Sequence, residues 1–224
     1  MIEKRPEGYV YVGEGKTERT QIGSNSTEWF SKDPRAMAYT AAKYATVAKL
    51  LGRCPRALEV GCGDGFGSSI LAQVTGVLDC VDINYHNYQE ARTCWGHLKN
   101  VAFWNCDFLK FDHPWKSNHN AIVALDVLEH IDPLSEREFL LRVADGLHRD
   151  GIFICGMPTL NSQEYATDYG KAGHVNCQHP FKITETLKEY FDNVFSFGMT
   201  DGHINVGFEP MRQYQLNLAV GPKT

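Results

Sequence analysis

From residue 56 onward, short apolar runs of the kind that form buried strands alternate with stretches of helical or polar pattern. The strand-like runs lie at 56–61, 77–83, 101–106, 121–128 and 151–158. The stretches between them include helical patterns at 66–74, 86–96 and 139–147. This alternation predicts βαβ units, and therefore a mostly parallel sheet with helices on both faces.

The last quarter of the chain follows a different pattern. A helical pattern near 183–191 precedes two strand-like runs, at 194–200 and 214–220. About a dozen residues without helical periodicity separate these two runs, which indicates a long hairpin. We therefore predict an α/β fold with a doubly wound, mostly parallel seven-stranded sheet whose last strand is antiparallel.

Two helix starts can be recognised from their end residues. Asp33 and Pro34 have the order of an N-cap and a first helical position, and Gly52 is a plausible end of the same helix. Its predicted apolar face is formed by Met37, Ala41, Tyr44, Ala48 and Leu51. Ser135 and Glu138 have the spacing of a capping box at the start of a later helix.

Length and composition agree with one ordinary globular domain. The 224 residues carry a formal charge of −5 and a hydrophobic fraction of 43%. Residues 1–33 are polar and predict an N-terminal arm or lid, followed by a single domain over 34–224. The mild acidity has no electrostatic signature of nucleic-acid binding.

The chain has neither an apolar run of about 18 residues nor a recognisable signal peptide, so we expect no membrane partner. Its seven cysteines are scattered and contain no C-x-x-C pair. This pattern is typical of reduced, mostly buried cysteines in a cytoplasmic protein. A homodimer is left open.

The most specific motif is a glycine-rich segment, ALEVGCGDGFG, that joins the first predicted strand to a helix. Glycine occupies four alternate positions from Gly61 to Gly67, which lets the backbone turn sharply and approach a ligand closely. A dinucleotide fingerprint requires glycine where this chain has Phe66, and a P-loop requires a lysine after its last glycine. The loop is therefore poorly suited to a diphosphate.

Glu59, Gly61, Gly63 and Gly65 reproduce the E-x-G-x-G-x-G pattern. In this the sequence resembles class I S-adenosylmethionine-dependent methyltransferases. The resemblance implies S-adenosylmethionine as cofactor and S-adenosylhomocysteine as product. It implies that the loop, including Cys62, holds the amino-acid end of the cofactor, and that Glu59 orders the loop.

Acidic residues follow the next two predicted strands. Asp82 closes the second strand and can accept hydrogen bonds from both ribose hydroxyls, with Ile83 beside it. The alternative is that Asp82 is only a strand-end turn residue. Asp107 follows the third strand, and the resemblance assigns it and Phe108 to the adenine. Trp29 in the arm is a candidate cover for the cofactor.

The fourth predicted strand ends in LDVLEHI, a segment common in small-molecule methyltransferases. Asp126 falls at the carboxyl end of this central strand, where open α/β sheets bind ligands. Glu129 and His130 are either a hydrogen-bonded structural pair or substrate-facing residues. The N/D-P-P-Y/F motif of many nucleic-acid amino-methylating enzymes is missing from this position.

His174 is the candidate catalytic base, because its loop follows the fifth strand and a histidine can take a proton near neutral pH. It is equally well explained as a loop histidine bonded to backbone. The neighbouring Cys177 and His179 are too close in sequence to complete a tetrahedral site with it, so we predict no metal. The segments SNSTEWFSKDP and GHVNC are also similar to a bacterial subgroup of these methyltransferases without a known acceptor.

The predicted function is methyl transfer to an oxygen or nitrogen atom of a small or medium polar acceptor. A nicotinamide-dependent oxidoreductase is the alternative enzyme, disfavoured by Phe66 and by the C-terminal hairpin. A non-catalytic cofactor-binding module is the third alternative, and His174 argues against it. Three further aromatic or apolar residues are candidates for the acceptor pocket, although core packing is an alternative for each: Phe208, Met211 and Tyr214.

Overall fold

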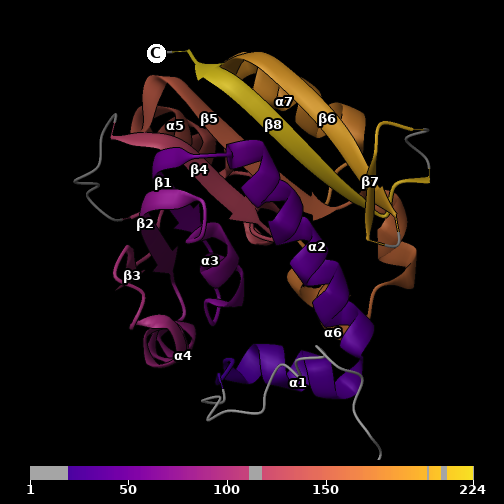
Figure 1. Cartoon of the computed structure of the whole chain (residues 1–224). Coiled ribbons are helices and arrows are strands. Elements are labelled where there is room, and N and C mark those ends of the chain that lie inside the picture. The colour runs from indigo at the N-terminus through magenta and orange to yellow at the C-terminus, as the bar shows by residue number, and fades with distance from the viewer. Residues whose placement is uncertain (1–19, 111–117, 201, 208–210, 224) are drawn as a thin grey trace, which may run out of the picture.

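A computed structural model describes residues 20–110, 118–200, 202–207 and 211–223. Its centre is one mixed sheet of eight strands, with helices on both faces (Figure 1). The strands are β1 Cys54–Val60, β2 Thr75–Asp82, β3 Val101–Asn105, β4 His119–Leu125, β5 Leu147–Pro158, β6 Phe191–Thr200, β7 His203–Asn205 and β8 Tyr214–Pro222. The α-helices are α1 Ser24–Lys32, α2 Pro34–Leu51, α3 Phe66–Leu71, α4 Tyr85–Trp95, α5 Glu136–Gly146, α6 Asp168–Gly173 and α7 Pro180–Tyr190.

The strand order is β3-β2-β1-β4-β5-β8-β6-β7. The first five strands in this order are parallel, and β8 runs antiparallel to both β5 and β6. The doubly wound, mostly parallel sheet with an antiparallel last strand is therefore confirmed. The predicted count of seven strands is wrong, because β7 adds an eighth that pairs with the end of β6. Three residues are too few to show a strand alternation in the sequence.

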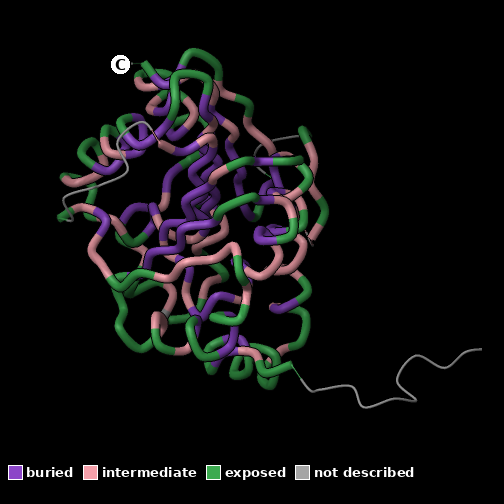
Figure 2. Tube along the Cα trace, turned by 60° about the vertical axis from the view of Figure 1, so that its left-hand side comes forward, coloured by how far each residue is buried: buried purple, intermediate pink, exposed green. Residues whose placement is uncertain are grey.

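Each face of the sheet has its own apolar core, as expected for buried parallel strands. Leu58 and Val60 of β1 pack on the side of α5 and α7, whereas Ala57 packs on the side of α2 and α3. In Figure 2 the buried trace lies mainly along the strands, and the exposed trace lies around them. No helix in the described ranges is long and apolar enough to cross a membrane.

Helix starts were predicted with mixed success. Asp33 caps α2 by accepting a hydrogen bond from the backbone N–H of Arg35, at 3.0 Å. Ser135 is the N-cap of α5, but its side chain makes no capping hydrogen bond, and Glu138 instead pairs with Arg142. The predicted capping box is therefore wrong: the spacing is present, but the glutamate has a closer partner one turn along its own helix.

The order of the strands reverses between β1 and β4, since the chain winds from β1 outward to β3 and then returns to β4. Val60 and Ala124 lie side by side where these two central strands end. Open α/β sheets bind ligands in the crevice at such a reversal. The topology thus places the loops after β1 and β4 next to each other.

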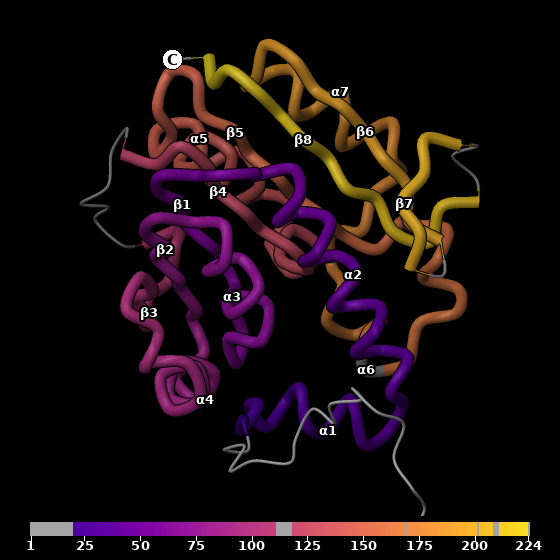
Figure 3. Tube along the Cα trace, viewed as in Figure 1, coloured from indigo at the N-terminus to yellow at the C-terminus, as the bar shows by residue number. Residues whose placement is uncertain are grey.

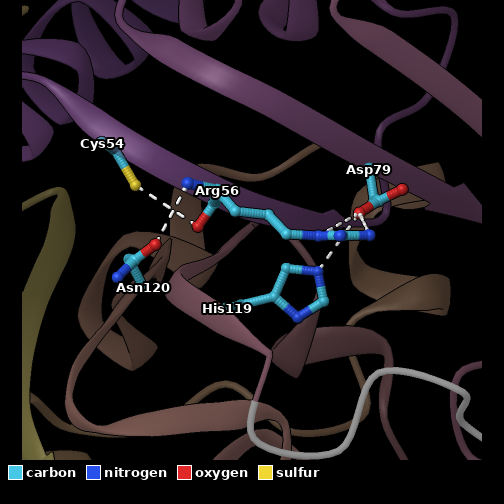
Figure 4. Close-up of polar contacts among 5 residues, drawn as sticks. All are labelled: Cys54, Arg56, Asp79, His119 and Asn120. Carbon is cyan, nitrogen blue, oxygen red and sulfur yellow. Dashed lines mark hydrogen bonds and ion pairs between the residues drawn. The ribbon is translucent and has the colours of Figure 1, made fainter.

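A buried polar network joins the three strands β1, β2 and β4 (Figure 4). Asp79 accepts hydrogen bonds from the Arg56 guanidinium at 2.8 Å and from Nε2 of His119 at 3.3 Å. Both Asp79 and His119 are buried. Burial alone would raise the pKa of Asp79, but the bonds from His119 and Arg56 outweigh it and hold the pKa below its ordinary value. The network therefore stabilises the fold only while Asp79 is ionised.

We predict that Asp79→Asn lowers the free energy of unfolding by about 1–3 kcal/mol at neutral pH, because it weakens charged hydrogen bonds. The lowered pKa means that this contribution is complete above the ordinary pKa of 3.8 and is lost as the pH falls through the folded-state value. Urea unfolding at neutral and acidic pH should show the wild type and the variant converging in acid. Glu185→Gln, which breaks an exposed ion pair with Lys188, is the control and should have little effect. A pH-independent difference for Asp79→Asn would contradict the account.

Candidate functional site

The loop between β1 and α3 turns on three glycines with positive φ. Gly61, Gly63 and Gly65 have φ values of 74°, 56° and 81°, which side chains other than glycine adopt at a cost. A Cβ atom on Gly61 would meet a methyl group of Val127 at 2.4 Å, and one on Gly65 would meet Trp95 at 2.7 Å. A Cβ atom on Gly63 would point into open space. The middle of the loop is therefore the part that a ligand can approach.

Glu59 lies beneath this loop and lines none of the cavities described below. Its carboxylate accepts a hydrogen bond from the Ser68 hydroxyl, and the thiol of Cys80 lies 3.6 Å away. Burial raises the pKa of Glu59 to about 7. Close to it, the ring of Tyr44 occupies the space where a Cβ atom on Gly67 would lie. Glu59 therefore lies where it could order the loop, and that role stays a prediction.

Asp82 links the end of β2 to the glycine loop. One carboxylate oxygen accepts the N–H of Gly63 at 2.8 Å, and the other accepts the N–H of Asn84 at 2.8 Å. Asp82 therefore makes the hydrogen bonds of a strand-end turn residue. Oδ1 also accepts from the Asn87 side chain at 3.4 Å, so the further lone pair open to a ligand is on Oδ2, the oxygen bonded to Gly63. The ribose role stays a prediction, but the carboxylate does lie at the predicted place.

Helix α1 closes over the glycine loop from the N-terminal arm. Both the N–H and the hydroxyl of Ser26 donate to the Asp64 carboxylate, at 2.7 and 2.9 Å. The N–H of Ser24 donates to Glu90 of α4 at 2.9 Å. Gly23 lies against Asp64 so closely that a Cβ atom would not fit. Figure 3 shows α1 crossing the end of the molecule where α4 also lies. Residues 24–32 are therefore helical and anchored, and the lid role of the arm stays a prediction.

Three cavities follow the carboxyl ends of the strands. The strand-end cavity, of about 100 Å³, lies over β2 and β3. Its lining includes Gly61, Asp82, Ile83, Asp107 and Phe108. The glycine-loop cavity, of about 160 Å³, lies between this loop and α1. Its lining includes Trp29, Gly61, Cys62, Gly63 and Asp126. Gly61 thus borders both cavities.

The large cavity, of about 610 Å³, lies beyond Asp126, which lines it together with the glycine-loop cavity. The three cavities therefore form a series in which Gly61 and Asp126 are the two junctions. The large cavity is also lined by His174, Tyr39, Lys43, Met211 and Tyr214. Phe208, predicted to line the same pocket, is outside the described residues.

Asp126 has a strained backbone, with a φ of 56° that is rare outside glycine. Its N–H donates to the carbonyl of Gly156 in β5 at 2.9 Å, and its carboxylate forms an ion pair with the buried Lys43. The ammonium group of Lys43 also lies 4.7 Å from the ring centre of Tyr214, as in a cation–π contact. Helix α2 and strand β5 thus hold the junction between the cavities in one position.

Lys43 was missed by the sequence analysis. It neighbours Tyr44, one of the residues on the predicted apolar face of α2, and it is itself buried. A lysine on a helix is normally assigned to the solvent-exposed face. Its partner lies 83 residues away, so no local pattern could have identified the pair.

His174 lies where the large cavity meets the loop after β5. Its Nδ1 is 2.7 Å from the side-chain oxygen of Gln163, which can only accept, so the proton is on Nδ1 and the lone pair is on Nε2. Burial, together with the nearby His130, lowers the pKa of His174. The ring is therefore neutral near neutral pH. The alternative of a purely backbone-bonded histidine is wrong, because the partner of Nδ1 is a side chain.

Asn176 and Gln178 fix the loop that carries His174. Both side-chain amides donate to the carboxylate of Glu136 at the start of α5, the first at 2.7 Å. The backbone N–H of Asn176 donates to the carbonyl of Glu129 at 3.0 Å. Residues 128–130 form the short 3₁₀ helix η1, so this loop is held against η1.

Glu129 and His130 do not form the hydrogen-bonded pair that the sequence suggested. Nδ1 of His130 donates instead to the carbonyl of Gly173 at 2.9 Å. The carboxylate of Glu129 is fully buried, and neither of its oxygens has a hydrogen-bond partner among the described residues. Burial, and then the charge of Asp126, raise the pKa of Glu129 well above its ordinary range.

Comparison with known proteins relates the core of the chain to methyltransferases. Residues 58–155 match the family model described as a methyltransferase domain. No curated protein matches the sequence. The methyltransferase domain of bacterial CtHen1-C is similar in structure, with a TM-score of 0.67, 16% identity, and coverage of 82% of this chain and 99% of that one.

Two further solved structures contain S-adenosylhomocysteine. The N-methyltransferase NodS from Bradyrhizobium japonicum WM9 matches with a TM-score of 0.63 and 16% identity, over 87% of this chain and 91% of that one. The DhpI–SAH complex matches with a TM-score of 0.65 and 17% identity, over 89% of this chain and 93% of that one. At these identities the likeness establishes the fold.

We predict that Ser26→Ala loosens α1, because it removes one of two hydrogen bonds to a buried carboxylate, a contact worth about 1.5–3 kcal/mol. Amide hydrogen exchange across residues 24–32 should accelerate at least about tenfold. The matched control is Ser31→Ala in the same helix, whose hydroxyl donates only to a carbonyl of that helix. Equal exchange rates in the two variants would show that Asp64 does not anchor the arm.

Proposed function

We propose that the chain is a class I, S-adenosylmethionine-dependent methyltransferase that methylates an oxygen or nitrogen atom of a small or medium polar acceptor. The observation that carries this proposal is the series of three cavities with Asp126 at the second junction. An elongated cofactor can occupy the first two cavities, and its reactive end then faces the third.

In this arrangement the adenine occupies the strand-end cavity, whose walls are mostly apolar and suit a flat ring. Asp107 and the backbone of Phe108 face its polar edge, and Asp82 accepts the ribose hydroxyls. The amino-acid end follows the loop past Gly63 under Trp29. The sulfonium then lies near the partly exposed carboxylate of Asp126, which favours its positive charge.

The bonds within the loop argue against a dinucleotide. The N–H groups of Gly61 and Cys62 both donate to the carbonyl of Val81, and that of Gly63 donates to Asp82. A pyrophosphate site needs such N–H groups free and positive surroundings. Here they are used internally, and Asp82 adds negative charge. The nicotinamide-dependent alternative is therefore disfavoured on physical grounds as well as by Phe66.

The reaction itself demands little chemical assistance. A lone pair of the acceptor attacks the methyl carbon, the sulfur–carbon bond breaks, and its electron pair stays on sulfur to leave S-adenosylhomocysteine. The acceptor atom loses its proton. The chain contributes in-line positioning and exclusion of water. We assign His174 to activating the acceptor atom, in the simplest case by taking its proton on Nε2.

The cofactor assignment predicts that S-adenosylhomocysteine binds in calorimetry and that NAD does not. Gly63→Ala should weaken this binding at least about tenfold, since its Cβ atom would enter the glycine-loop cavity at a strained φ. Gly52→Ala, which also has a positive φ and open space but lies away from the cavities, should cost stability without changing affinity. Binding of NAD alone, or equal affinity in the two variants, would refute the assignment.

The acceptor assignment is tested with His174→Gln. A screen of polar alcohols, phenols and amines for released S-adenosylhomocysteine identifies a working acceptor first. Turnover of that acceptor should then fall about 100-fold in the variant, because the activating nitrogen is lost. The affinity for S-adenosylhomocysteine should stay unchanged, since His174 lines only the large cavity. Full turnover in the variant would remove His174 from the reaction.

A further inference from the structure

Three potential metal ligands meet where η1 packs against the loop of His174. One ligand atom from each of Glu129, His130 and His174 lies within 4.8 Å of the other two. The rings of His130 and His174 meet edge to face, with centres 5.0 Å apart. Two imidazoles and one carboxylate are a common set of protein ligands for a divalent ion that keeps other coordination positions open.

Both imidazoles are oriented as metal ligands usually are. Nδ1 of His130 donates to the carbonyl of Gly173, and Nδ1 of His174 donates to the side-chain oxygen of Gln163. Each hydrogen bond leaves the lone pair on Nε2 and holds the ring in place. This use of the second nitrogen is typical of metal-bound histidines.

The carboxylate of Glu129 supplies the independent observation. It is fully buried, and neither oxygen has a hydrogen-bond partner in the part of the chain that the structure describes. A buried polar group without a partner costs free energy and therefore calls for an explanation. A cation between this carboxylate and the two imidazoles would supply the missing partner.

We propose that Glu129, His130 and His174 bind one divalent first-row transition ion beside the large cavity. Nitrogen ligands favour ions such as Mn²⁺ or Zn²⁺ over Mg²⁺. The ligand atoms have to move toward a common point to reach metal distances of about 2.0–2.2 Å. This proposal differs from the prediction made from the sequence, which was that the chain binds no metal.

A catalytic role for this metal site rests on the proposed function. His174 lines the large cavity, so the ion would lie at the wall where the acceptor binds. An ion there binds an acceptor oxygen and lowers the pKa of its hydroxyl, which releases its proton to solvent. The lone pair of His174 then binds the ion instead of the proton. The inference therefore favours a hydroxyl acceptor.

The test measures Mn²⁺ binding to the full chain after treatment with EDTA. Binding is detected as the loss of the free Mn²⁺ signal in electron paramagnetic resonance. We expect one ion per chain, displaced by Zn²⁺ and only weakly by Mg²⁺. Glu129→Gln, His130→Gln and His174→Gln should each lower the affinity at least about 100-fold. Gln163→Leu, which removes the bond to Nδ1 of His174, should lower it about tenfold.

His179→Gln is the matched control, because His179 is exposed and belongs to the other histidine and cysteine group considered from the sequence. It should bind Mn²⁺ as the wild type does. His130 is also exposed, so His130→Gln should fold normally, and a thermal melt checks this. Absence of Mn²⁺ binding, or unchanged binding in His130→Gln and His174→Gln, overturns the proposal. Calorimetry with S-adenosylhomocysteine on the same samples reports separately on the proposed function.

Discussion

The backbone between Val60 and Phe66 must reverse over the carboxyl ends of the central strands, and it does so through three residues with positive φ. This turn is held from below by the hydrogen bond from Ser68 to Glu59 and from the side by the bond from Gly63 to Asp82. Because Glu59 is buried and Asp82 ends a neighbouring strand, the turn is attached to the sheet itself. The strand-end cavity and the glycine-loop cavity both border this turn, at Gly61.

A second fixed point lies across the crevice at Asp126. Its strained backbone is held by β5 and its carboxylate by Lys43 of α2, so the junction between the glycine-loop cavity and the large cavity is rigid. Helix α1 completes the enclosure through the contact between Ser26 and Asp64. The sheet edge holds the residues of the crevice in place, and exclusion of water is the role that we propose for the arm. Methyl transfer from an activated sulfonium needs little beyond these two conditions.

The sequence was informative wherever function is encoded by neighbouring residues. The alternation of glycines from Gly61 to Gly67 predicted a sharply turning loop after the first strand, and the acidic residue at the end of the second strand, Asp82, lies beside that loop. The sheet followed from the alternation of apolar runs, apart from β7, which is too short to have a period. Signals of this kind are local, so one sequence is enough to detect them.

The contacts that the sequence did not predict join distant segments. Lys43 meets Asp126 across 83 residues, and His130 contacts Gly173 across 43. The alternative in which Glu129 and His130 form a hydrogen-bonded pair failed for the same reason. A ligand atom of His174 lies within 4.8 Å of both residues, and His174 comes from another loop. Such groupings are set by the strand order, which brings η1 and the loop after β5 to one edge of the sheet.

The central claim is that one elongated ligand spans the first two cavities with its reactive end at Asp126. A crystal structure of the chain with S-adenosylhomocysteine tests it most directly. The account predicts adenine beside Asp107, the ribose on Asp82, and the sulfur next to Asp126, facing the large cavity. A sulfur atom turned away from that cavity, or a nucleoside bound elsewhere on the molecule, would contradict it.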